Sequence, residues 1–278
     1  MNTSELQSTC EAVYRRYHHP RYISPDPLEL VRCYNSLEDR EIAAFIAAAL
    51  ALGRVDGIVK AVRWVLERLE WPTRLLYAPE AELRDLAEPF VYRFFDGEQL
   101  FGLLLGLRRV ISDSGSLEAR FIATSAPADR EPASVTMKGL ARLVDGLVEA
   151  ADGRLDGSIL VARPEKQSAC KRLLLFLRWM VRSDSVDPGG WTVLSPAELL
   201  VPLDTHMLSV ARSLGLTSAR QPSLRVVQDV TEGFRAVRPN DPVRYDFSLT
   251  RAGINPQVRR EIRTDPIRTK WWSLTQPA

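Results

Sequence analysis

Residues 36–53, SLEDREIAAFIAAALALG, constrain the fold more than any other stretch of this chain. Their apolar side chains recur every three or four positions, which is the spacing of one face of an α-helix and not the alternation of a β-strand. Ser36 followed by Asp39 is close to the capping-box pattern that starts helices, and Gly53 is typical of the residue after a helix end. The apolar part is too short to span a bilayer. The stretch therefore predicts a helix with a buried face in a soluble protein.

Similar helical spacing recurs along most of the chain. The clearest further segments are 4–17, 55–70, 97–115, 116–125 and 136–153, followed by helices that begin near 171 and near 204. Alternating strand patterns are missing, since WTVLS and SLRVVQDV could each form a short strand at most. We expect irregular structure in 124–135, 183–196 and 255–268. These patterns together predict an all-α fold.

Composition narrows the class of protein without indicating an activity. Hydrophobic residues make up 45% of the chain, so a core can form, and the net charge of +2 is too small to indicate nucleic-acid binding by itself. Three widely spaced cysteines suggest neither a disulfide framework nor a metal site. The first residues lack the basic and apolar segments of a signal peptide. We therefore expect a cytoplasmic monomer with no metal, no cofactor and no membrane association.

The densest basic region is RPEKQSACKRLLLFLRWMVR, residues 163–182. Its cationic residues outnumber the single acidic residue Glu165, and they are Arg163, Lys166, Lys171, Arg172, Arg178 and Arg182. Lys171 and Arg172 are expected in the first turn of the helix that follows, where exposed backbone N–H groups and nearby cations favour a phosphate. The alternative is a solvated basic helix edge with no ligand.

Asp204 lies between an apolar run and a helical pattern in VPLDTHMLSVARSLGL, residues 201–216. It is the natural N-cap of that helix, and most aspartates at such positions only cap. Because Pro202 and Leu203 make the approach rigid and apolar, the carboxylate is also expected to be partly desolvated, which raises its pKa. His206, just inside the helix, is a candidate general base, although packing and hydrogen bonding are the commoner role of such a histidine.

The same segment resembles the VDTHV…R…LGL segment of the helix-hairpin-helix DNA glycosylases, which include the endonuclease III and oxoguanine glycosylase branches. EIAAFIAAALALGRVDGIVKAV and DPVRYDFSLTRAGI are similar to an early and a late helix of that superfamily. Residues 20–254 also resemble a family of uncharacterised bacterial proteins related to these enzymes. The resemblance implies two helical lobes with a cleft between them. One lobe would comprise 37–203 and end in the hairpin, and the other would comprise 1–36 plus 204–278.

The resemblance implies a DNA repair N-glycosylase that acts on a damaged base in double-stranded DNA, with an added lyase activity and a location at the nucleoid. In that superfamily an aspartate at the position of Asp204 is catalytic, and Lys171 matches the lysine that forms a Schiff base, with Arg178 in its place if the alignment shifts. The residues expected to contact nucleic acid are Arg54, Lys166, Arg172 and Arg178. Those expected to line the base pocket, although each could instead be a core residue, are His206, Trp179, Trp191, Tyr245 and Phe247.

One departure from the superfamily keeps other functions open. Its hairpin normally contains glycines that let backbone amides approach a phosphate, whereas RPEKQSACKRL contains none. The alternative is therefore a non-catalytic nucleic-acid-binding protein that keeps the glycosylase fold. A third hypothesis is an enzyme that acts on RNA or on a nucleotide.

Overall fold

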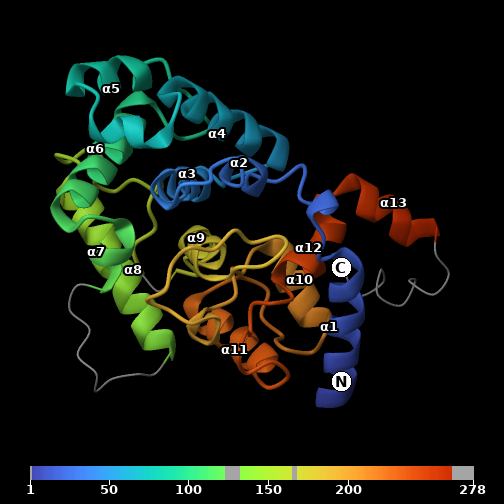
Figure 1. The fold of residues 1–278 in the computed structure, drawn as a ribbon. Helices are drawn as coiled ribbons and strands as arrows, with labels where there is room; N and C mark the ends of the chain where they lie inside the picture. The colour runs from blue at the N-terminus through green and yellow to red at the C-terminus, as the bar shows by residue number, and fades with distance from the viewer. Residues whose placement is uncertain (1, 123–131, 165–167, 265–278) are drawn as a thin grey trace. The chain divides into compact units, whose positions relative to one another are not determined.

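The computed structural model describes residues 2–122, 132–164 and 168–264 (Figure 1). Within these ranges it contains thirteen α-helices and no β-strand, which confirms the all-α prediction. The chain forms two compact units: a discontinuous unit, Met1–Asp26 with Lys166–Ala278, and a central unit, Pro27–Glu165. None of the described helices is both long enough and apolar enough to cross a membrane.

The central unit is built around α3 (Leu37–Ala49), the helix that the sequence indicates most strongly. Ser36 is its N-cap and accepts a hydrogen bond from Asp39 N at 3.1 Å, as predicted. This helix packs against α2 (Leu28–Val31) and α4 (Val55–Leu69). All its residues from Glu41 to Ala49 are buried. The core of the unit therefore surrounds this helix on all sides, and not only along one stripe.

The longest helix pair of the central unit is α6 (Gly97–Ser114) and α8 (Pro132–Glu149). They pack together, and α6 also contacts α5 (Glu80–Ala87) and α7 (Leu117–Ile122). A Cβ atom on Gly106 would lie only 2.7 Å from the carbonyl oxygen of Leu147, so a glycine is needed for this close approach. The apolar faces predicted from helical spacing are thus buried against one another.

A buried glutamate connects two helices of the central unit. Glu41 is 4% exposed, and its carboxylate accepts hydrogen bonds from the backbone N–H groups of Leu117 at 2.9 Å and Glu118 at 3.0 Å. These N–H groups belong to the first turn of α7 and have no partner within their own helix. Glu41 of α3 therefore caps the N-terminus of α7.

We expect Glu41→Ala to destabilise the central unit by about 1–3 kcal/mol, because it leaves the buried N–H group of Leu117 and the partly buried N–H group of Glu118 without an acceptor. Urea unfolding measures the loss, and amide hydrogen exchange at Leu117 and Glu118 locates it. Glu38→Ala is the matched control, since Glu38 is exposed on the same helix. An unfolding free energy equal to that of the wild type would show that water replaces the carboxylate at no cost.

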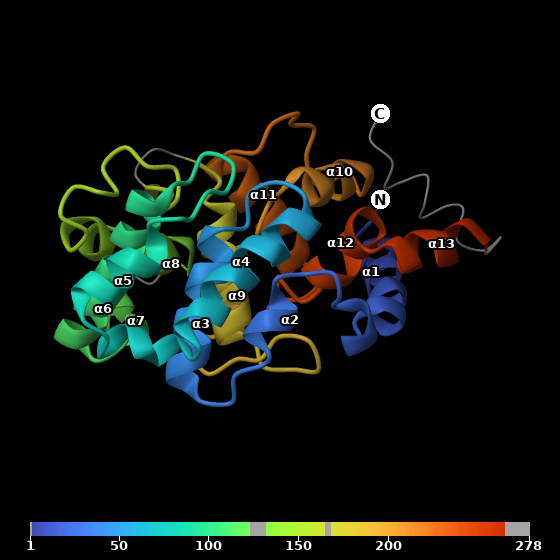
Figure 2. The same ribbon diagram turned by 90° about the horizontal axis from the view of Figure 1, so that it is seen from above.

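The discontinuous unit is organised around α12 (Asp246–Ile254), which is buried from Asp246 to Ala252. It packs against α1 (Thr3–Tyr17), α10 (Thr205–Ser213) and α13 (Pro256–Thr264), and Figure 2 shows these helices close together. The remaining helices of the unit are α9 (Lys171–Val181) and α11 (Leu224–Arg235). Residues from both ends of the chain thus share one core.

The boundary between the units differs from the predicted division at residue 203. It falls between Glu165 and Lys166, so the helix that begins at Lys171 belongs with Asp204, and residues 27–36 belong to the central unit. The reason is that α9 carries buried arginines whose carboxylate partners lie later in the chain, at Asp241 and Asp246.

Several local predictions were wrong. SLRVVQDV forms α11, because Ser223 caps it and its apolar residues contact the core at helical spacing. Of the stretch 255–268, expected to be irregular, residues 256–264 form α13 and 265–268 lie outside the described residues. Helix α1 is capped by Asn2, one residue before the helix, rather than by Ser4. WTVLS, for which at most a short strand was expected, forms none, in agreement with the all-α prediction. Of the predicted irregular stretch 124–135, residues 124–131 lie outside the described residues and 132–135 begin α8.

Candidate functional site

Two predicted catalytic residues lie next to each other in the discontinuous unit. Lys171 is the first residue of α9 and Asp204 is the N-cap of α10. The Lys171 Nζ and Asp204 Oδ2 atoms are 3.8 Å apart, and the two side chains are 29% and 22% exposed. An amine and a carboxylate from different helices thus form a pair that solvent reaches.

Asp204 uses its two oxygens differently. Oδ1 accepts a hydrogen bond from Met207 N at 2.8 Å, which is the capping role expected from the sequence. Oδ2 faces the amine of Lys171. Capping therefore does not occupy the whole carboxylate, and one oxygen remains on the side of the lysine.

The surroundings of this pair are cationic. Both α9 and α10 begin here, and the N-terminus of a helix carries a partial positive charge. Arg172 follows Lys171, and burial lowers the pKa of its guanidinium to about 10, so that it is still charged at neutral pH. Cys170, immediately before α9, has φ 45°, a left-handed conformation that more often belongs to glycine. The left-handed turn is therefore present although the segment contains no glycine.

A network of buried ions lies further along α9. Asp187, which is fully buried, accepts hydrogen bonds from Arg178 Nε at 3.1 Å and Nη2 at 2.9 Å, and it also pairs with Arg182. Arg178 pairs in addition with Asp246 of α12. Arg182 pairs with two further carboxylates, Asp184 at 2.9 Å and Asp241 at 3.0 Å. Two arginines one turn apart are thus held by four aspartates.

The pKa values of this network follow from burial and from charge. Burial alone lowers the pKa of Arg178, but the charges of Asp187 and Asp246 outweigh it and raise the pKa above its usual range. Burial raises the pKa of Asp184, yet the contact with His18 and the charge of Arg182 outweigh it, and the net shift is downward.

Asp246 couples this network to the Lys171–Asp204 pair. Its pKa is raised, first by burial and then by the negative charge of Asp204, against the opposite effect of Arg178. The negative charge of Asp204 therefore raises the pKa of a buried carboxylate, and the positive charge of Arg178 opposes this effect. Asp246 pairs with Arg178 of α9 and not with an arginine near it in the sequence.

Arg178 is not placed to contact nucleic acid, contrary to the prediction. It is 3% exposed, and carboxylates occupy both edges of its guanidinium. Two arginines spaced four residues apart in the apolar run LLLFLRWMVR were a signal that buried acids must neutralise them. The sequence argument missed Asp187 and Asp241, which lie in loops after α9 and before α12.

The aromatic residues predicted to line a base pocket are core residues instead. Trp179 and Tyr245 are fully buried, and Phe247 and Trp191 are 1% and 3% exposed. Tyr245 donates a hydrogen bond from its hydroxyl to Glu11 at 2.8 Å. Trp179 and Phe247 lie at buried positions of α9 and α12, whereas Trp191 lies in the loop after α9 and Tyr245 immediately before α12.

The other predicted residues are more scattered. His206 is exposed, and its ring packs against Gly253 of α12, where a Cβ atom would lie 2.4 Å from Nδ1. Arg54 is exposed but belongs to the central unit. Lys166 lies outside the described residues. The structure therefore brings together Lys171, Arg172, Asp204 and His206 at the starts of α9 and α10, and not the full predicted set.

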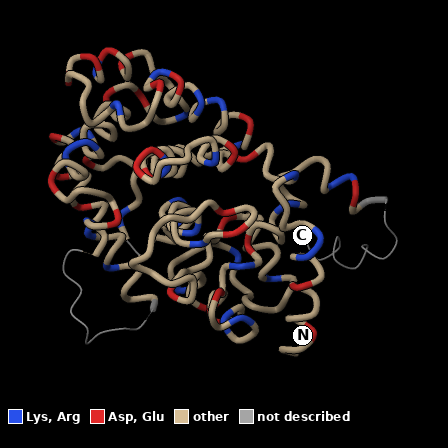
Figure 3. Tube along the Cα trace, viewed as in Figure 1, with Lys and Arg blue, Asp and Glu red and all other residues tan. Residues whose placement is uncertain are grey.

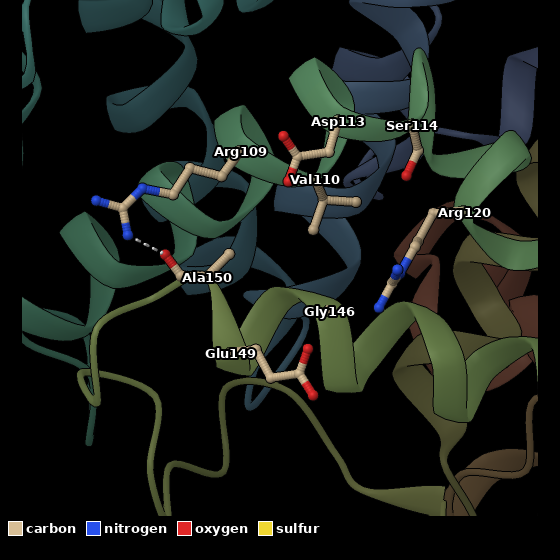
Figure 4. A pocket seen from close by; sticks show the side chains of 8 residues that line it. All are labelled: Arg109, Val110, Asp113, Ser114, Arg120, Gly146, Glu149 and Ala150. Carbon is tan, nitrogen blue, oxygen red and sulfur yellow. Dashed lines mark hydrogen bonds between the residues drawn. The ribbon is translucent and has the colours of Figure 1, made fainter.

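A separate pocket of about 370 Å³ lies in the central unit between α6, α7 and α8 (Figure 4). Its lining is largely charged and comprises Arg109, Val110, Asp113, Ser114, Arg120, Gly146, Glu149 and Ala150. Arg109 turns to the carbonyl oxygen of Ala150, to which it donates a hydrogen bond at 2.8 Å. None of the predicted site residues lines this pocket, so it does not belong to the Lys171–Asp204 pair.

These observations define an all-α protein of two compact units with an amine–carboxylate pair at the starts of two helices. A family model described as "Protein of unknown function (DUF2400)" matches residues 26–255, and the chain belongs to that family. The match includes both Lys171 and Asp204. Neither the curated proteins nor the solved structures contain a match to the chain.

Proposed function

We propose that this protein is a DNA N-glycosylase with lyase activity, in which Lys171 is the nucleophile and Asp204 the catalytic carboxylate. The observation that carries the proposal is the 3.8 Å separation between the Lys171 amine and the Asp204 carboxylate, both of which solvent reaches. An amine and a carboxylate on one side of a sugar are the two groups that base removal through a covalent intermediate requires.

The proposed chemistry uses each group once. The ammonium of Lys171 first loses a proton to water, so that Asp204 remains ionised. The neutral amine then attacks C1′ of the sugar while the bond to the base breaks, and the base leaves with the bonding electron pair. Of the two amine protons, one goes to the base and the other to the ring oxygen as the sugar opens, which leaves an imine between Nζ and C1′. Asp204 stabilises the positive charge that develops on the sugar.

The cationic surroundings support nucleic acid as the substrate. The N-termini of α9 and α10 offer positive charge beside the pair, which suits a backbone phosphate. Figure 3 shows basic and acidic residues interspersed along the helices, so that binding would depend on such local groups rather than on net charge.

The simpler interpretation is that the pair is only structural. Asp204 caps α10, and a partly exposed lysine–aspartate pair contributes about 0–1 kcal/mol to stability. Together with the absence of glycine before α9, this favours the alternative of a nucleic-acid-binding protein without catalysis. The two functions differ in whether a covalent intermediate forms.

Borohydride trapping tests the lyase step without knowledge of the preferred base. The aldehyde of an abasic site condenses with the amine, water leaves, and borohydride reduces the imine to a stable amine link. We expect the wild-type protein to form an adduct with a duplex that contains one abasic site, and Lys171→Gln to form at least 100-fold less. Lys138→Gln, an exposed lysine of α8, is the control and should react as the wild type does. An adduct that persists in Lys171→Gln, or a wild-type protein that binds the duplex without an adduct, would leave only the binding function.

A further inference from the structure

The connection between α5 and α6 ends in a tight turn with an exposed aromatic ring. Tyr92 and Phe95 exchange two backbone hydrogen bonds of 2.9 Å each, which leaves Arg93 and Phe94 at the tip. Phe94 is 69% exposed and the neighbouring Val91 is 81% exposed. A single exposed apolar residue is ordinary on a protein surface, so exposure alone indicates nothing.

The backbone of this turn is held in an unfavourable conformation. Arg93 has φ 56°, in the left-handed region that residues with a side chain seldom adopt. The Tyr92 hydroxyl donates a hydrogen bond to the carbonyl oxygen of Leu52 at 2.8 Å and so ties the turn to the loop between α3 and α4. Contacts from another part of the unit therefore hold the tip in place.

This attachment brings two arginines together. The side chain of Arg93 lies over Gly53, where a Cβ atom would be 2.9 Å from Arg93 Nη1, and Gly53 itself has φ 111°. Arg54 is the next residue, and both arginines are exposed. No ion pair to either guanidinium occurs among the residues that the structure describes. Arg93 Cζ also lies 5.6 Å from the centre of the Phe94 ring.

We propose that Phe94, Arg93 and Arg54 form a binding surface for single-stranded nucleic acid, where one unpaired base stacks on Phe94 and the arginines contact the adjacent phosphates. Guanidinium groups bind phosphate through paired hydrogen bonds, and any base can stack on an aromatic ring. This choice of partner rests on the proposed function, while the surface itself lies in the other unit of the chain.

The small size of the surface favours a strand over a protein. A stable protein interface buries about 800 Å² on each partner, with a cluster of apolar residues at its centre. This turn offers one exposed ring and one exposed valine, with Arg93 at its tip and Arg54 next to the glycine that Arg93 covers. One ring and two guanidiniums fit one base and its flanking phosphates.

Fluorescence anisotropy of the full chain with a labelled 20-nucleotide thymidine strand tests the surface. Loss of one stacked base predicts that Phe94→Ala weakens binding about 5- to 150-fold, whereas Phe94→Trp binds as the wild type does. Arg93→Gly, which suits the backbone conformation, and Arg54→Gln should each weaken binding and reduce its dependence on salt. Tyr77→Ala is the matched control, because Tyr77 is an 81% exposed aromatic residue of the same unit, and it should bind unchanged.

The proposal is overturned if Phe94→Ala binds the strand as tightly as the wild type, or if the wild type binds no single strand. It is also overturned if the wild-type protein self-associates or binds vesicles and Phe94→Ala loses that property while it still binds the strand. The surface would then bind another partner. Adduct formation by Lys171 is measured separately. A strand-binding protein that yields no adduct would disprove the lyase proposal alone, and an adduct-forming protein with unchanged Phe94→Ala binding would disprove this surface alone.

Discussion

Asp187→Ala is expected to destabilise the discontinuous unit by about 3–5 kcal/mol, the loss typical when one partner of a buried ion pair is removed. Asp187 is fully buried and pairs with both Arg178 and Arg182. Its removal leaves the buried Nε and Nη2 groups of Arg178 without their acceptor, and Asp246 is then the remaining partner of that arginine among the described residues. The remaining partners, Asp246 on one side and Asp184 with Asp241 on the other, cannot move into the vacated position without breaking their own contacts.

Urea unfolding followed by tryptophan fluorescence measures this change, because Trp179 and Trp191 lie in the same unit. The central unit also contains tryptophans, so hydrogen exchange of α9 amides is needed to assign the loss to the discontinuous unit. Asp229→Ala is the matched control, since Asp229 is exposed on α11. A loss below about 1 kcal/mol for Asp187→Ala would mean that water enters and solvates the arginines, and that the network is not a source of stability.

Asp204→Asn is expected to lower the rate of base release by about 10²–10³-fold, the usual effect of removing one preorganised electrostatic group from an active site. The substitution separates the two roles of this residue. Asparagine caps helices as well as aspartate does, so the hydrogen bond from Met207 N is preserved while the negative charge facing Lys171 is lost. A loss of activity with unchanged stability would therefore come from the charge.

Base release is measured on duplexes that each contain one modified base, with uracil, hypoxanthine and 8-oxoguanine as the first set. Binding to the same duplexes should be at least as tight as that of the wild type, since a negative charge has been removed. Asp229→Asn, which loses one charge from the same unit, is the control and should retain full activity. Equal rates for Asp204→Asn and the wild type would assign Asp204 to capping alone.

The buried network bears on both predictions because it holds α9. The helix that presents Lys171 at its first residue carries Arg178 in its last turn and is followed by Arg182 as its C-cap. The carboxylate partners of the two arginines come from the following loop, from the segment before α12 and from α12 itself. A network of this kind favours one position of the helix over others, because any shift separates buried charges. The amine and the carboxylate are in this way kept adjacent by groups that do not touch either of them.

Local features were readable from the sequence because they depend on residues a few positions apart. Helical spacing identified most helices, Ser36 and Asp204 were recognised as N-caps, and one face of the apolar run at residues 42–50 was recognised as buried. Capping and periodicity arise from backbone hydrogen bonds within one or two turns, so no distant contact is needed to infer them.

Only the tertiary structure could decide which of the candidate residues meet. Arg178 and Asp246 are 68 positions apart in the sequence, and their pairing could not be inferred from a local pattern. Because of it, Arg178 lies in a buried ion pair and not at a surface that nucleic acid could contact. Long-range packing also sets the unit boundary at residue 165 and not at 203. It buries the aromatic residues that were expected to line a pocket, and it places Lys171 beside Asp204. The physical reason is that desolvation depends on everything that surrounds a side chain, and those neighbours come from segments whose approach no local pattern encodes.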